Sequence, residues 1–99
     1  MDAGSAVIML ARFEAREGLA GLLRSRLQEM VRLTLVESGC DRYELHQLED
    51  DPAQLLLIEQ WDTQESLDAH METDHVRALI SDVPNLAVRD IEIIRLRRI

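Results

Sequence analysis

Hydrophobic residues along this chain follow two periods, the two-residue repeat of strands and the 3.6-residue repeat of helices. Residues 6–15 form a short apolar run of the kind found in a buried strand. From Leu19 to Leu35, leucine, methionine and valine recur every three or four residues, largely with arginine and glutamine between them. This spacing predicts a long amphipathic helix that ends near Ser38-Gly39, because glycine accepts the left-handed conformation that closes helices.

Three further strands are predicted. Residues 40–49 and 54–61 are strand-like runs separated by the turn formers Asp50-Asp51-Pro52-Ala53, so together they predict a hairpin. Residues 87–99 predict a long last strand. The apolar alternation shifts there at Ile93-Ile94, which is typical of a β-bulge.

Two helical segments are predicted between the hairpin and the last strand. Glu65 follows Asp62 by three residues, the spacing of a capping box, and this predicts a helix that runs through Met71. A short turn of helix is predicted over residues 74–81. Pro84-Asn85 is expected to stop it, because proline cannot continue a helical hydrogen-bond ladder.

The predicted order β-α-β-β-α-β is the ferredoxin-like α+β arrangement, an antiparallel sheet with helices on one face. We expect residues 1–99 to form one domain, because 99 residues supply a single core. The run Leu55-Leu56-Leu57-Ile58 is apolar on both faces of its strand, so the face away from the helices also needs a cover. A second copy is the simplest cover, and we expect a twofold homodimer.

Charge and composition exclude several classes of partner. The chain has 11 Lys and Arg against 19 Asp and Glu, and a net charge of −8 repels nucleic acid. No apolar run approaches the roughly 20 residues that span a bilayer, and residues 1–5 lack the basic region of a signal peptide. The single cysteine, Cys40, excludes a disulfide within the chain and fits a reducing compartment. We therefore expect a cytoplasmic protein without nucleic-acid or membrane partners.

Candidate chemistry lies on the hairpin, in a register that follows if Glu49 pairs with Gln54 across a four-residue loop. Tyr43 would then project from the mostly apolar face. The opposite face would be chemically mixed and would carry Arg42, Glu44, His46, Leu57, Glu59 and Trp61. Trp61, the only tryptophan, suits a pocket for a planar aromatic molecule. The alternative is that the polar residues are simply the solvated side of a half-buried sheet.

The other histidines lie in the second helical region. His70 and His75 are five residues apart instead of the four that align two ligands on one helical face, so no metal site is predicted. His70 pointing at the sheet would be a proton carrier near neutral pH, or else a buried structural histidine. Cys40 is interpreted as a small buried residue.

Three stretches resemble a known family: E-S-G-C-D-R-Y-E-L-H-Q at residues 37–47, I-E-Q-W-D at 58–62 and L-D-A-H-M-E-T-D-H at 67–75. They resemble the signature of the antibiotic biosynthesis monooxygenase superfamily, most closely its quinol monooxygenase-like branch. The resemblance implies ferredoxin-like dimers whose sheets meet in a barrel-like interface, with a cavity between sheet and helices in each subunit. It also implies oxidation of phenolic, polyketide or quinol substrates by molecular oxygen without flavin, heme or metal.

The resemblance also implies roles for individual residues. Trp61 and His46 match a cavity tryptophan and a cavity histidine of the family, while His70, His75 and Tyr43 match its quinol-type pattern. On this basis His46 or His70 would remove a phenolic proton and Trp61 would hold the ring. The residues expected to bind substrate are Tyr43, Arg42, Glu59, His75 and Leu57.

Some positions depart from the family pattern. Leu57, Leu67 and Ser81 stand where the anthrone-oxidising branch has polar groups, so most of its proton relay is missing. Ile80 and Ala11 stand where the heme-degrading branch needs an axial histidine and an asparagine, so heme is not expected as a cofactor.

Two other functions fit the sequence. One is an isomerase or other proton-transfer enzyme acting on a small phosphorylated metabolite, with Arg42 pairing with the anion, since guanidinium binds phosphate and carboxylate well. The other is a non-catalytic, dimeric ligand-binding module in which the histidines are structural.

Overall fold

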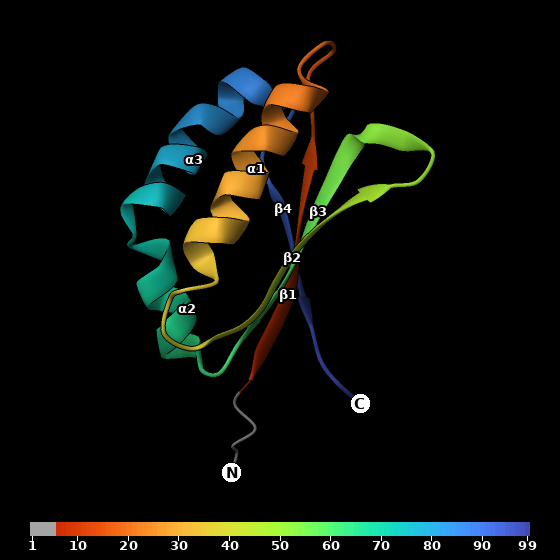
Figure 1. Ribbon diagram of the computed structural model, residues 1–99. Helices are drawn as coiled ribbons and strands as arrows, with labels where there is room; N and C mark the ends of the chain where they lie inside the picture. The colour runs from red at the N-terminus through yellow and green to blue at the C-terminus, as the bar shows by residue number, and fades with distance from the viewer. Residues whose placement is uncertain (1–5) are drawn as a thin grey trace.

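The computed structural model describes residues 6–99, so residues 1–5, on which the signal-peptide interpretation rests, lie outside the described residues. A four-stranded sheet carries all of the described helices on one face (Figure 1). No described helix is long and apolar enough to cross a bilayer. The elements in chain order are β1 (Val7–Glu14), α1 (Ala20–Thr34), β2 (Cys40–Leu48), β3 (Asp51–Trp61), α2 (Gln64–Met71), α3 (Asp74–Leu86) and β4 (Glu92–Leu96).

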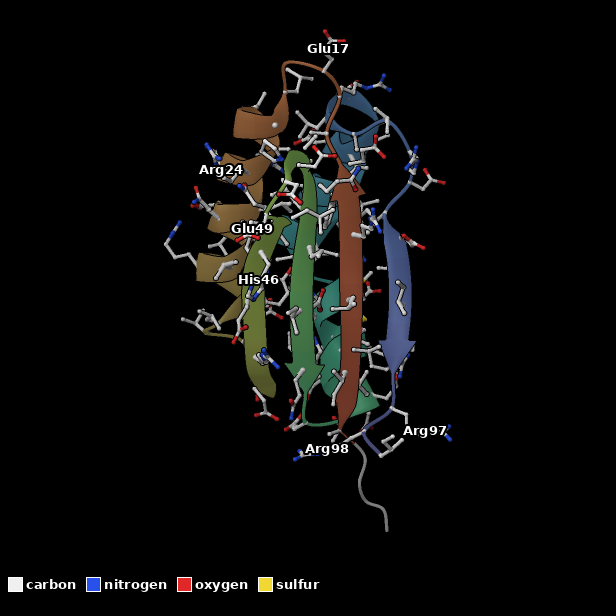
Figure 2. The ribbon with its side chains drawn as sticks, turned by 90° about the vertical axis from the view of Figure 1, so that its right-hand side faces the viewer. Glu17, Arg24, His46, Glu49, Arg97 and Arg98 are labelled. Atoms are coloured by element: carbon white, nitrogen blue, oxygen red, sulfur yellow. The ribbon has the colours of Figure 1, made fainter. Side chains whose placement is uncertain are left out.

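The strands lie in the order β2-β3-β1-β4, and each neighbouring pair is antiparallel. Figure 2 shows this order from the open side, with the helices behind the sheet. The two central strands are therefore β1 and β3. The strand β1 is the first in the chain, and β3 is the second strand of the hairpin. The predicted ferredoxin-like α+β fold is confirmed.

The core lies between the sheet and the helices. In β1, every second residue is buried toward the helices, as a period of two requires. In α1, the buried residues recur at three and four positions. The α1 residues are Leu23, Leu27, Met30 and Thr34. Burying each of the two leucines contributes about 1.5–3 kcal/mol, so this stripe fixes the helix on the sheet.

The predicted register of the hairpin is wrong by one residue. Tyr43, not Glu44, pairs with Glu59. The strand β3 begins at Asp51, inside the predicted turn, and the ladder shifts between Gln47 and Leu48. Because the ladder is irregular beside the turn, the length of the predicted loop does not determine which residues of β2 and β3 pair.

A shift of one residue moves a side chain to the other face of the sheet. Tyr43 therefore lies under the helices, where it is 3% exposed. His46 pairs with Leu56 and projects from the open face (Figure 2). Arg42 pairs with Gln60 and lies four residues from His46 along the strand, so it projects from the same face. The prediction that His46 and Arg42 share a face with Trp61 is wrong.

The second helical region also differs from its prediction. The cap of α2 is Thr63, whose side chain accepts a hydrogen bond from the Ser66 amide, and not Asp62. The helix α3 continues through Pro84 to Leu86 instead of stopping. The Arg16 side chain donates two hydrogen bonds to the Pro84 carbonyl, and the Arg16 amide donates one to the carbonyl of Leu86. These bonds satisfy carbonyls at the helix end, so the last turn persists.

The last strand is shorter than predicted and has no bulge. Its register with β1 is continuous from Glu92 to Leu96. Ile94 pairs with Leu10 on the open face, whereas Ile93 lines the space beneath the helices. Apolar residues on both faces of one regular strand produce the same sequence pattern as a shifted alternation.

Gly39 allows the loop after α1 to pack against the start of α2. Its φ is +84°, and a Cβ placed there would lie 2.2 Å from Ser66 Oγ and 2.4 Å from Asp62 Oδ1. The Gly39 carbonyl also accepts a hydrogen bond of 2.8 Å from the Asp62 amide. Only glycine fits this contact without strain. The loop is therefore held beside the first turn of α2.

Candidate functional site

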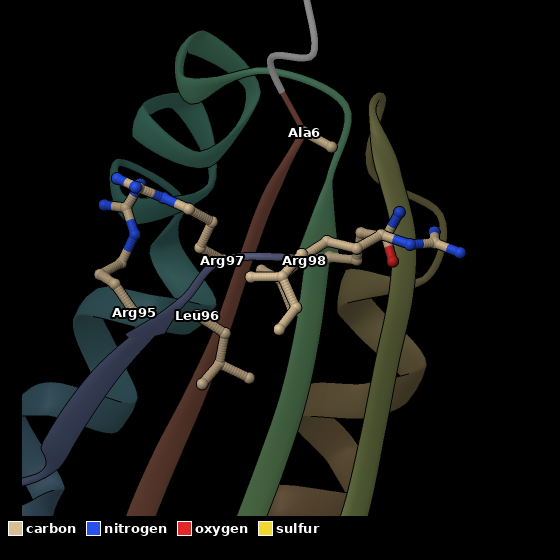
Figure 3. A pocket seen from close by; sticks show the side chains of 8 residues that line it. Ala6, Arg95, Leu96, Arg97 and Arg98 are labelled. Atoms are coloured by element: carbon tan, nitrogen blue, oxygen red, sulfur yellow. The ribbon is translucent and has the colours of Figure 1, made fainter.

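Two hollows on the surface lack the chemistry of the predicted site. The larger, about 890 Å³, lies on the sheet near the C-terminus and includes Arg95, Arg97 and Arg98 (Figure 3). A second, about 200 Å³, is lined by residues of α1 and α3 and contains one ion pair, Arg26 with Asp82. Neither hollow contains a histidine, so neither offers a group that ordinarily exchanges a proton near neutral pH.

A cavity of about 50 Å³ lies between the sheet and the helices. Three of its lining residues carry polar groups, namely Tyr43, Glu59 and His70, and the rest of the wall is apolar. Tyr43 and Glu59 come from the paired strands β2 and β3, while His70 comes from α2. Each of these three residues is 3% exposed, so their polar groups are shielded from solvent.

The side chain of Glu59 is a buried carboxyl group that accepts one hydrogen bond. Its side chain Oε1 accepts a hydrogen bond of 3.1 Å from Trp61 Nε1. Burial raises the pKa of Glu59 to about 7, and the charge of Glu37 adds to the rise, whereas the Trp61 hydrogen bond opposes it. Glu59 therefore exchanges its proton near neutral pH.

His70 is buried against the indole and bound to a carboxylate. Its ring centroid lies 4.6 Å from that of Trp61, and its Nδ1 lies 2.9 Å from Glu37 Oε2. Because a carboxylate oxygen only accepts, the hydrogen bond assigns the proton to Nδ1 and leaves Nε2 as an acceptor in the neutral ring. Burial lowers the pKa of His70, although Glu37 partly opposes this, so the ring is neutral at pH 7.

His75 shares the same carboxylate. Its Nε2 lies 2.6 Å from Glu37 Oε2. The helix is broken between α2 and α3, with Thr73 capping the second helix. A spacing of four residues aligns two ligands only within one continuous helix, and His70 and His75 lie on two different helices. The break lets both rings approach one oxygen.

Tyr43 completes the buried aromatic group. Its ring centroid lies 5.7 Å from that of His70, in an edge-on arrangement. Burial, followed by the charge of Glu59, raises the pKa of the Tyr43 phenol. The hydroxyl group is therefore uncharged at neutral pH and is available for hydrogen bonding.

The structure brings together most of the predicted site residues, but not all. Five of them form one buried group: Tyr43, Leu57, Glu59, Trp61 and His70. His75 joins this group through Glu37. His46 and Arg42 lie on the open face, where both contact the Glu44 carboxylate. Their shared environment is therefore a solvated ion cluster.

Glu37 is the functional candidate that sequence reasoning missed. It follows α1 in a loop whose backbone is fixed by a bond of 2.9 Å from the Glu37 amide to the Thr34 carbonyl. The available signal was Gly39, which indicates a tight turn two residues later. Nothing in the local sequence indicates which helix that turn approaches.

Glu59 gives the protein a specific dependence of stability on pH. Its folded pKa of about 7 lies above the ordinary value of 4.5, so the stability from its protonated form is complete below about pH 4.5 and is lost as pH rises through 7. We expect wild type to lose on the order of 3 kcal/mol over this window relative to Glu59→Gln, which keeps an acceptor for Trp61. Urea denaturation across the pH range measures the difference. Parallel profiles would contradict the assignment.

Comparisons with known proteins agree with this fold. The family model for antibiotic biosynthesis monooxygenase matches residues 6–81. The protein named "Putative monooxygenase Rv0793", from Mycobacterium tuberculosis, is 30% identical over 89 residues, which cover 90% of this chain and 87% of that protein. Its solved structure has a TM-score of 0.89 at 29% identity and covers 96% of both chains.

A second structure, PA3566 from Pseudomonas aeruginosa, has a TM-score of 0.90 at 28% identity and covers 96% of this chain and 95% of that chain. The family match spans most of the chain, and these relatives align over nearly all of it. The chain therefore belongs to the antibiotic biosynthesis monooxygenase family.

Proposed function

We propose that this protein is a monooxygenase that oxidises a small hydroxylated aromatic compound or quinol with molecular oxygen and no cofactor. Family membership supports the class of reaction. The observation that supports the chemistry most is the hydrogen bond that orients His70 through Glu37 at the wall of a cavity shared with Tyr43 and Glu59.

In this proposal His70 is the general base. Its Nδ1–H donates to Glu37, so Nε2 is free to take the phenolic proton of the substrate. The Glu37 carboxylate then stabilises the imidazolium ion, as the buried acid does in a catalytic triad. Removal of the proton leaves an electron-rich phenolate that transfers an electron to oxygen more readily than the phenol does.

The reaction balances without an external reductant. One oxygen atom enters the ring of the product, and the other is released as water. All four electrons come from the substrate, as in the conversion of a quinol and O2 into a hydroxyquinone and water. Glu59, which is half protonated near pH 7, is the proposed proton donor to the reduced oxygen.

The walls of the cavity favour a neutral ring. None of its lining residues is lysine or arginine, and Arg42 lies on the other face of the sheet, so a phosphate group would have no cation here. At about 50 Å³ the cavity is smaller than the roughly 300–1,000 Å³ of most ligand sites. Met71, Ile80 and Ile93 line it and are each at least 42% exposed. These three side chains would move outward when a substrate binds.

Oxygen consumption with dihydroxynaphthalenes and anthrones tests the role of His70. We expect His70→Asn to lower kcat by about 10²–10⁴-fold, because a general base typically supplies that factor. We expect Glu37→Gln to lower it less, since the base remains. His46→Ala is the matched control for losing an imidazole, and its rate should equal that of wild type.

Circular dichroism would show that each variant is folded. Wild-type rates in His70→Asn, or a loss of rate confined to His46→Ala, would contradict the assignment. No oxygen consumption by wild type with any substrate of the panel would favour a non-catalytic, ligand-binding module.

We also propose that the open face of the sheet is covered by a second copy of the chain. It exposes two apolar side chains of the edge strand β4, Ile94 at 39% and Leu96 at 44%. Neighbouring strands extend this apolar surface through the half-buried Ile8, Leu10, Leu56 and Ile58. An apolar surface shared by three strands is typical of a protein interface.

Sedimentation equilibrium tests this proposal. We expect a dimer for wild type and a monomer for Ile58→Asp, because a charge at the centre of the apolar surface would have to be buried. Leu22→Asp, on the helical layer, is the control and should remain dimeric. A monomeric wild type, or a dimeric Ile58→Asp, would contradict the proposal. The cytoplasmic location expected from the sequence stays a prediction.

A further inference from the structure

One carboxylate and two imidazoles converge where the loop after α1 meets the break between α2 and α3. Glu37 Oε2 lies 2.9 Å from His70 Nδ1 and 2.6 Å from His75 Nε2. The three atoms all lie within 4.8 Å of one another. Within residues 6–99, this is the one place where three such ligand atoms come together.

We propose that Glu37, His70 and His75 bind a divalent transition-metal ion of the zinc class. Two imidazole nitrogens and a carboxylate oxygen are the donors that zinc, cobalt and nickel prefer. An ion about 2.0–2.2 Å from each donor holds the donor atoms roughly 3–4 Å apart. The two separations from Glu37 Oε2 are slightly shorter, so a small outward movement of the side chains makes room for the ion.

The cluster is open on one side and closed on the other. The side chain of His70 is 3% exposed, whereas those of Glu37 and His75 are 15% and 19% exposed. An ion therefore reaches the cluster from solvent past His75. Three protein ligands leave a fourth position of a tetrahedral ion for water, as in many zinc sites that exchange ligands.

The backbone holds all three ligands in place before any ion arrives. Gly39 packs the Glu37 loop against the start of α2. Thr73, at the break between the helices, donates a hydrogen bond of 2.7 Å from its hydroxyl to the His70 carbonyl. Its side chain also caps the helix that carries His75. Preorganised ligands lose little conformational entropy on binding, which favours affinity.

A bound ion would change the chemistry of the cavity. A neutral imidazole that coordinates through Nδ1 carries its proton on Nε2. His70 would then donate a hydrogen bond toward the cavity instead of accepting a proton there. Zinc is therefore expected to inhibit the proposed oxidation, and this consequence alone rests on the proposed function.

Calorimetric titration of the chelator-treated chain with zinc chloride tests the site. We expect one zinc ion per chain for wild type. We expect Glu37→Gln and His75→Ala each to weaken binding by about 100-fold. Losing a direct ligand costs at least as much affinity as losing a residue that only hydrogen-bonds to a ligand. His46→Ala is the matched control, because His46 has one carboxylate neighbour, Glu44, in an exposed pair. Its affinity should equal that of wild type.

The absence of zinc binding by wild type would overturn the proposal. Equal affinity in wild type, Glu37→Gln and His75→Ala would also overturn it, as would a loss confined to His46→Ala. The titration needs no substrate, so its result is independent of whether oxygen is consumed. Zinc binding at this site with an unchanged rate of oxygen consumption would leave the metal site in place and contradict the assignment of His70 as the base.

Discussion

The hydrogen bond between His70 Nδ1 and the Glu37 carboxylate is the interaction on which the site depends. It joins the loop after α1 to the last turn of α2, and it fixes which nitrogen of the imidazole carries the proton. Neither partner is freely solvated, so the bond is protected from competition by water. The same carboxylate binds His75, so the proposed base and the proposed metal site share Glu37.

The two faces of the sheet separate two kinds of chemistry. Under the helices, Glu59 and His70 are desolvated, and their pKa values move in opposite directions, upward for the acid and downward for the base. Near pH 7, Glu59 is therefore about half protonated and His70 is mainly uncharged, which suits proton transfer. On the open face, Arg42, Glu44 and His46 are solvated and compensate one another's charges. Such exposed pairs contribute little to stability.

The sequence was sufficient for the fold, because the periods of two and 3.6 residues are strong and agree with the ferredoxin-like order of elements. It also indicated Trp61 and His70, which the structure places in the buried group, and their roles stay predictions. It was not sufficient for the hairpin register, because nothing in the local sequence marks the irregularity between Gln47 and Leu48. The error of one residue in the predicted register put both His46 and Tyr43 on the wrong face of the sheet.

Glu37 lay beyond sequence reasoning for a different reason. A glutamate after a helix usually faces solvent, and only the close contact of Gly39 with Ser66 brings this one to His70. Nitrogen-15 NMR of the imidazole rings at pH 7 tests the central claim most directly. The account predicts that His70 is neutral with its proton on Nδ1 and a bare Nε2. A His70 ring protonated on Nε2 alone, or on both nitrogens, would contradict it.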